Sequence, residues 1–211
     1  MSTVHFHQTQ TTPQRAAATR SDVATLVSGP VAAAEAPVRT TAARRALAAL
    51  RIGFGLTFLW AFFDKLLALG FATGRNPETG IVDRFGDAAW INGGSPTEGF
   101  LKFGADGPFQ GFYNSIAGAA WADWLFMLGL LGIGLALTLG IGMRLAAAAG
   151  VVLYLLMWSV VLPPSNNPVI DDHLLGAVTL VVLALAHAGD TWGLGRSWSR
   201  TPVVRDNAYL R

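Results

Sequence analysis

Three charged side chains stand in an apolar stretch that is long enough to cross a membrane. Arg51, Asp64 and Lys65 fall within residues 46–73, whereas a bilayer core of about 30 Å needs about 20 apolar residues. A charge at such a depth costs at least a few kcal/mol unless it is paired, hydrated or able to reach the headgroups. These residues are therefore candidates for function, to be weighed against structural roles.

Acidic and histidine side chains gather at the ends of the apolar stretches that we assign to the outer side. Asp64 and His173 could form a protonatable pair there, because histidine titrates near neutral pH and can pass protons to a redox ligand such as a quinone. In this hypothesis Asp64 and His173 are catalytic, and three neighbours bind the substrate: Lys65, Trp60 and Asp172. The alternative is structural: Asp171 and Asp172 cap a helix, and Lys65 reaches toward the outer surface.

At the opposite ends of these stretches, Arg51 and Asp190 are predicted to form a structural ion pair. Haem is disfavoured, because His173 and His187 share one predicted helix and lie about 21 Å apart along its axis. No group of residues has convincing metal-ligand spacing, so we expect no metal site. The chain contains no cysteine, which excludes disulfides and iron–sulfur clusters held by cysteine.

Four apolar blocks must position these residues. The chain has 211 residues, 52% hydrophobic and only 13% charged, whereas soluble domains have about 25% charged residues. The blocks lack strand alternation, so helices are the way to satisfy their backbone in lipid. They predict an all-α membrane protein, an antiparallel four-helix transmembrane bundle, with helices in residues 46–73, 122–140, 144–162 and 170–189.

Basic residues orient the predicted bundle. They flank the blocks in three places that must share one side if there are four crossings: Arg39, Arg44 and Arg45; Arg144; and Arg196, Arg200, Arg205 and Arg211. Positive residues collect on the cytoplasmic side. We therefore predict a multi-pass protein of the plasma membrane with both termini cytoplasmic.

The domain organisation follows from these blocks. Residues 1–45 form a predicted disordered cytoplasmic tail without a signal-peptide core, residues 46–192 the membrane domain, and residues 193–211 a cytoplasmic C-terminal tail. Residues 74–121 are expected to fold as an outer cap. Within them, Ser95, Pro96 and Glu98 form a capping box for a helix starting at Ser95, and a second short helix is expected after Asp106.

Helical spacing predicts which faces pack together. In residues 170–189 one face is bulky and suits lipid, namely Leu175, Val178, Val182 and Leu185, while the other is smaller and more polar: Asp172, Gly176, Thr179 and Leu183. In residues 122–140, small residues recur every four positions at Gly132, Ala136 and Gly140. Such stripes let membrane helices approach closely.

The chain resembles the DoxX/DoxD family. The resemblance extends over about residues 46–198, and two segments carry it: Phe62-Phe63-Asp64-Lys65, and the loop motif from Ala89-Trp90-Ile91-Asn92-Gly93-Gly94-Ser95-Pro96-Thr97 to Gly99-Phe100-Leu101. The DoxD type is identified as the large subunit of a quinone-linked thiosulfate dehydrogenase.

The resemblance implies an integral membrane subunit of an oxidoreductase that oxidises thiosulfate or a related sulfur anion and passes electrons to a membrane quinone. It also implies a small partner subunit; a homo-oligomer is the other expectation. Besides the lipid bilayer, no nucleic-acid partner is expected. A non-catalytic membrane scaffold that recruits redox partners is the alternative function. Transport is disfavoured, because the chain shows no inverted repeat and no broken helix at the bilayer midplane.

Overall fold

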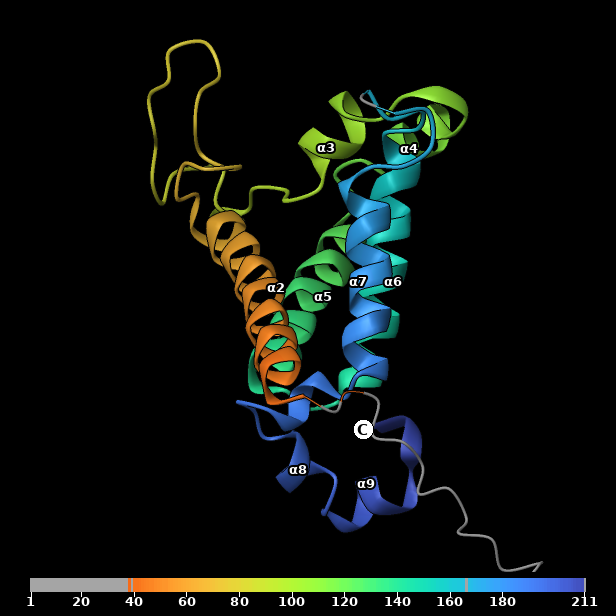
Figure 1. Ribbon diagram of the computed structural model, residues 1–211. Coiled ribbons are helices and arrows are strands. Elements are labelled where there is room, and N and C mark those ends of the chain that lie inside the picture. The colour runs from red at the N-terminus through yellow and green to blue at the C-terminus, as the bar shows by residue number, and fades with distance from the viewer. Residues whose placement is uncertain (1–37, 39, 166, 211) are drawn as a thin grey trace, which may run out of the picture. The chain divides into compact units, whose positions relative to one another are not determined.

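The computed structural model describes residues 38, 40–165 and 167–210 (Figure 1). Within this part of the chain the secondary structure is helical, without a strand and with one isolated antiparallel bridge between Arg75 and Val82. The all-α class is therefore confirmed. The predicted disorder of the N-terminal tail falls almost wholly on residues outside the described ranges.

Three helices are long and apolar enough to cross a membrane: α2 (Thr41–Leu67), α5 (Ala120–Leu139) and α6 (Met143–Val160). The first begins before the predicted residue 46, because the Thr40 side chain accepts a hydrogen bond from the Ala43 N–H and caps the helix there. These helices confirm the prediction of a membrane protein.

The fourth predicted block holds a shorter helix. α7 (Asp172–Leu185) has 14 residues, which span about 21 Å. After it the backbone turns, because His187 adopts a left-handed conformation (φ 51°) and Ala188–Asp190 forms a 3-10 turn, η3. The continuous helix predicted over residues 170–189 is therefore wrong at its C-terminal end.

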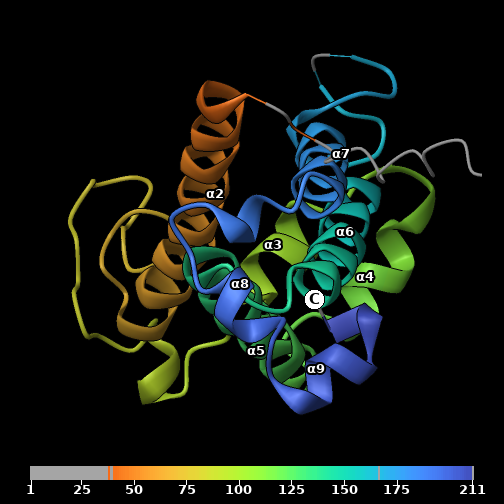
Figure 2. The same ribbon diagram turned by 60° about the horizontal axis from the view of Figure 1, so that its bottom comes forward.

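Each of the helices α2, α5, α6 and α7 packs against the next one along the chain. α2 packs along α5, α5 contacts α6, and α6 packs along α7, as the view in Figure 2 shows. Their shared core contains fully buried Met127, Leu137, Leu180 and Leu183. The predicted lipid-facing side chains of α7 are exposed, which confirms that face, but Asp172 on the other predicted face is exposed as well.

Two glycines bring α2 and α5 together. A Cβ at Gly134 would lie 2.8 Å from Leu59 Cγ, and Gly55 lies against Thr138 in the same contact. Gly132, which the small-residue stripe included, faces open space. The close approach predicted for α5 therefore exists, but it uses the neighbouring face of the helix.

The segment between α2 and α5 is built from short helical elements: η1 (Trp90–Asn92), α3 (Glu98–Phe103), η2 (Gly107–Phe109) and α4 (Gln110–Ile116). The Ser95 hydroxyl accepts the Glu98 N–H at 3.0 Å, so the predicted capping bond forms, although α3 begins at Glu98 rather than at Ser95. The Asp106 carboxylate caps η2 through the Gly107 N–H, at 2.7 Å. Both predicted short helices are present.

The predicted C-terminal tail folds back on the helices. It contains α8 (Gly195–Trp198), α9 (Pro202–Asp206) and η4 (Ala208–Leu210). The Leu194 N–H donates to the Leu139 carbonyl at 2.8 Å, η4 contacts α6, and Val204 is buried. These elements lie at the opposite end of the helices from α3 and α4 (Figure 1).

Candidate functional site: a histidine and carboxylate at the start of α7

Asp171 and His173 form a pair of mostly buried side chains at the start of α7. Asp171 is the N-cap residue, and its Oδ1 accepts the Leu174 N–H at 3.0 Å. Its other oxygen, Oδ2, lies 2.6 Å from His173 Nδ1. The N-cap position thus gives one carboxylate two roles, because its second oxygen reaches a side chain in the first turn.

The pair has a defined proton arrangement. Burial raises the pKa of the Asp171 carboxyl, but the hydrogen bonds from His173 and the Leu174 N–H oppose this effect, and the pKa lies below its ordinary value. Asp171 is therefore ionised at neutral pH and acts as an acceptor, so the proton of a neutral imidazole sits on Nδ1. Nε2 is then the ring nitrogen that makes no hydrogen bond to Asp171.

Two aromatic rings lie in a row beside this pair, between the helices. The Tyr154 ring centroid lies 6.2 Å from that of His173, and the Phe58 ring follows at 5.5 Å from Tyr154. Gly176 makes room for this row, because a Cβ there would lie 2.8 Å from the Tyr154 ring. The three rings come from α7, α6 and α2, so a mostly apolar surface adjoins the imidazole.

Asp64 occupies a different environment from the one predicted. Its carboxylate is buried and accepts three backbone N–H groups of the following loop, from Phe71 at 3.1 Å, Ala72 at 2.8 Å and Thr73 at 3.0 Å. No hydrogen bond or ion pair joins it to His173. The predicted Asp64–His173 pair is therefore absent from the structure, and Asp64 holds the start of the loop that follows α2 against that helix.

The three predicted substrate-binding residues do not form one site. Trp60 is exposed and packs edge to face on Phe71, with ring centroids 4.9 Å apart. The Lys65 ammonium lies 5.9 Å from the centre of the Phe126 ring. Asp172 alone adjoins the imidazole, with Oδ1 3.6 Å from His173 Nδ1, and its side chain is 93% exposed.

Arg51 is fully buried, and carbonyl groups rather than Asp190 surround it. Its guanidinium donates to the Leu137 carbonyl, to that of Thr138 at 3.0 Å, and to those of Thr191 at 3.4 Å and Trp192 at 2.9 Å. The predicted Arg51–Asp190 ion pair is not among these contacts. The charge instead meets the C-terminal end of α5, where the helix dipole favours a cation.

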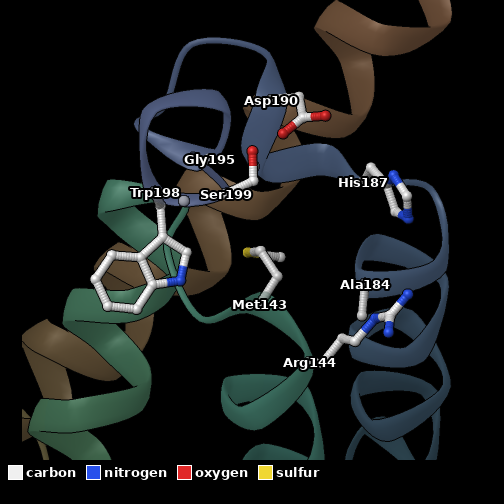
Figure 3. A pocket seen from close by; sticks show the side chains of 10 residues that line it. Met143, Arg144, Ala184, His187, Asp190, Gly195, Trp198 and Ser199 are labelled. Atoms are coloured by element: carbon white, nitrogen blue, oxygen red, sulfur yellow. The ribbon is translucent and has the colours of Figure 1, made fainter. Parts of the chain in front are cut away.

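The C-terminal ends of α5 and α7 and the start of α6 line a small cavity of about 110 Å³. Figure 3 shows Arg144 and His187 on one side of it and Trp198 on the other. Nearby, Arg44 Nε donates to Thr191 Oγ1 at 3.3 Å. The three basic regions used for the topology thus meet at one end of the helices, as the sequence predicts.

Asp171, Asp172 and His173 are also the residues to examine for a metal ion. One ligand atom from each lies within 4.8 Å of the others, an arrangement found at no other place in the described residues. They are consecutive in the chain, and Asp172 is exposed. Exposed acidic groups commonly cluster without an ion, so this geometry assigns no metal.

Sequence reasoning favoured a helix-capping role for Asp171 and paired His173 with Asp64 instead. The signal was the Asp-x-His spacing, which lets an N-cap carboxylate reach an imidazole two residues later. Comparison with known proteins adds no assignment: no family model, no curated protein and no solved structure matches this chain. The resemblance to the DoxX/DoxD family remains a prediction.

Proposed function

We propose that this protein is a membrane subunit of a quinone-linked oxidoreductase in which His173 exchanges protons with the quinone. The hydrogen-bonded Asp171–His173 pair beside the Tyr154 ring is the observation that supports the proposal most directly. Reduction of a quinone to a quinol consumes two electrons and two protons. A histidine held by a carboxylate is suited to that proton exchange, since the carboxylate orients the imidazole and stabilises its protonated form.

The surroundings of the pair suit a quinone headgroup. The partly exposed Tyr154 ring lies next to the imidazole and packs on the buried Phe58 ring, and flat rings pack well on aromatic side chains. The resemblance to the DoxD type suggests thiosulfate or a related sulfur anion as the electron donor. A small partner subunit or a second copy of the chain would complete the enzyme.

We propose further that α2, α5, α6 and α7 form an antiparallel four-helix bundle in the plasma membrane, with both termini cytoplasmic. The meeting of the basic regions at one end supports this orientation. The chain has no cysteine, so a single cysteine at Asn92 can report the topology. We expect an impermeant maleimide to label it from outside the cell, and labelling only from the cytoplasmic side would contradict the orientation.

Proton exchange at His173 can be tested with the purified protein in nanodiscs, by following reduction of a short-chain quinone with thiosulfate, sulfite or sulfide as donor. We expect His173→Gln to lower the rate about a hundredfold, the lower end of the range for general acid–base groups. Asp171→Asn should lower it as well and change its pH profile. The control is Asp87→Asn, which removes an exposed carboxylate of the loop between α2 and α5 and should have little effect.

The alternative scaffold function gives a different result in the same experiment. A scaffold would bind no quinone, and His173→Gln would leave turnover unchanged when the partner proteins are supplied. Equal rates in the wild type and the His173 variant, at matched protein levels, would remove this pair from the mechanism.

A further inference from the structure

A second cavity, of about 600 Å³, lies at the outer end of α5, away from the Asp171–His173 pair. It is bounded by η1, by the loop that leads to α3, and by the first turns of α5. The residues that decide its chemistry are Trp90, Ser95, Glu98, Asp123 and Trp124. Two of them, Trp90 and Ser95, come from the loop motif, for which the proposed function has no role.

Asp123 is a buried carboxylate with one oxygen in use and one free. Its side chain belongs to the first turn of α5, and the residue is only 6% exposed. Oδ1 accepts the Ser95 hydroxyl at 2.8 Å, the Thr97 hydroxyl at 2.6 Å and the Thr97 N–H at 3.2 Å. Oδ2 accepts no hydrogen bond from the described residues, although Asp123 lines the cavity. Oδ2 is therefore the carboxylate oxygen that remains available to a ligand in the cavity.

Two tryptophans form part of the cavity wall. Trp90 and Trp124 contact each other edge to face, with ring centroids 4.7 Å apart and an interplanar angle of 73°. The faces of indole rings attract cations more strongly than those of other aromatic side chains. Glu98 adds a second carboxylate, half exposed and 3.6 Å from Lys102. The cavity therefore combines negative charge with indole surface.

We propose that this cavity binds an organic ammonium cation, such as a quaternary ammonium group. The two carboxylates disfavour an anion, and the buried charge disfavours a purely apolar ligand. A bare metal ion would find few ligands, because an indole N–H is a donor only and Asp123 offers one free oxygen. The cation is either a free small molecule or the headgroup of a lipid, since both carry the same chemistry.

The test uses the whole chain, purified in a maltoside detergent, and choline as the probe in titration calorimetry. The comparison ligand is 3,3-dimethylbutan-1-ol, which has the shape of choline without its charge. We expect choline to bind at least about tenfold more tightly, as a desolvated cation–π contact of about 2 kcal/mol implies. Equal binding of the two ligands, or binding of neither, would overturn the proposal.

Variants locate the site. Asp123→Asn keeps an oxygen for Ser95 and Thr97 but removes the charge, and should weaken choline binding about tenfold or more. Because this change could disturb the loop, Trp124→Leu provides a second variant, expected to weaken binding about threefold to tenfold. The matched control is Trp121→Leu on the same helix, an exposed tryptophan outside the cavity lining. An equal loss in Trp121→Leu and Trp124→Leu would contradict this location.

Nanodiscs separate the two sources of the cation. If a lipid headgroup is the ligand, choline should bind more weakly in phosphatidylcholine discs than in phosphatidylglycerol discs, and phosphatidylcholine should copurify with the wild type but not with Asp123→Asn. If a free cation is the ligand, choline should bind equally in both discs. These results leave the quinone assay of His173 unaffected, so the two proposals fail independently.

Discussion

Replacing Asp64 with alanine should lower the melting temperature of the detergent-solubilised protein by about 6–20 °C. The change leaves the N–H groups of Phe71, Ala72 and Thr73 without their acceptor. A hydrogen bond to a charged group contributes about 1.5–3 kcal/mol. Because Phe71 and Ala72 are exposed, water replaces part of this contribution, and we expect the three lost bonds to cost about 3–5 kcal/mol together. For a chain of this length, 1 kcal/mol corresponds to about 2–4 °C.

The same experiment separates a structural role of Asp64 from a catalytic one. Asp64→Asn should also destabilise the protein, because its amide NH₂ would face backbone donors. The control is Asp87→Ala, an exposed carboxylate in the same loop, which should melt like the wild type. If Asp64→Ala kept the wild-type melting temperature but lost quinone reductase activity, the catalytic role predicted from the sequence would be restored and the structural one rejected.

Replacing Arg51 with methionine should be at least as damaging. The guanidinium satisfies carbonyls from two places, Leu137 and Thr138 at the end of α5 and Thr191 and Trp192 near the C-terminus. A buried carbonyl left without its donor costs about 1–3 kcal/mol, and the guanidinium serves four carbonyls, so we expect a loss of about 4 kcal/mol or more. We expect a melting temperature at least about 10 °C lower and a reduced yield of folded protein. Arg51→Lys should not restore stability, because an ammonium cannot reach carbonyls on both sides at once.

Two control variants test whether the loss of stability in Arg51→Met comes from the lost carbonyl contacts. Arg45→Met removes an exposed arginine one turn and a half earlier on α2 and should be nearly neutral. Asp190→Asn distinguishes the carbonyl contacts from the ion pair predicted from the sequence. If Asp190→Asn destabilised the protein as much as Arg51→Met does, the carbonyl contacts would not explain the role of Arg51.

The sequence by itself determined the features that depend on neighbours within a few residues. The apolar blocks predicted the long helices, because length and hydropathy are local properties. The Ser95, Asp106 and Asp171 caps join residues one to three positions apart, and α7 shows the predicted lipid-facing side. The charge pattern also placed the basic regions at one end, since alternating crossings require it.

The tertiary structure alone decided the partners of the charged residues. Arg51 reaches carbonyls 86 to 141 positions away, and Asp123 binds Thr97 across 26 residues. Asp64 is nearer to its partners, but they are backbone N–H groups of a loop whose path no side-chain pattern encodes. Sequence reasoning matched charges with opposite charges, whereas the folded chain satisfied Arg51 and Asp64 with backbone dipoles. Among packed apolar helices, the carbonyl and amide groups that lack a partner at helix ends and in loops are available to bind charged side chains. Only the fold determines which charged side chain each of these groups meets.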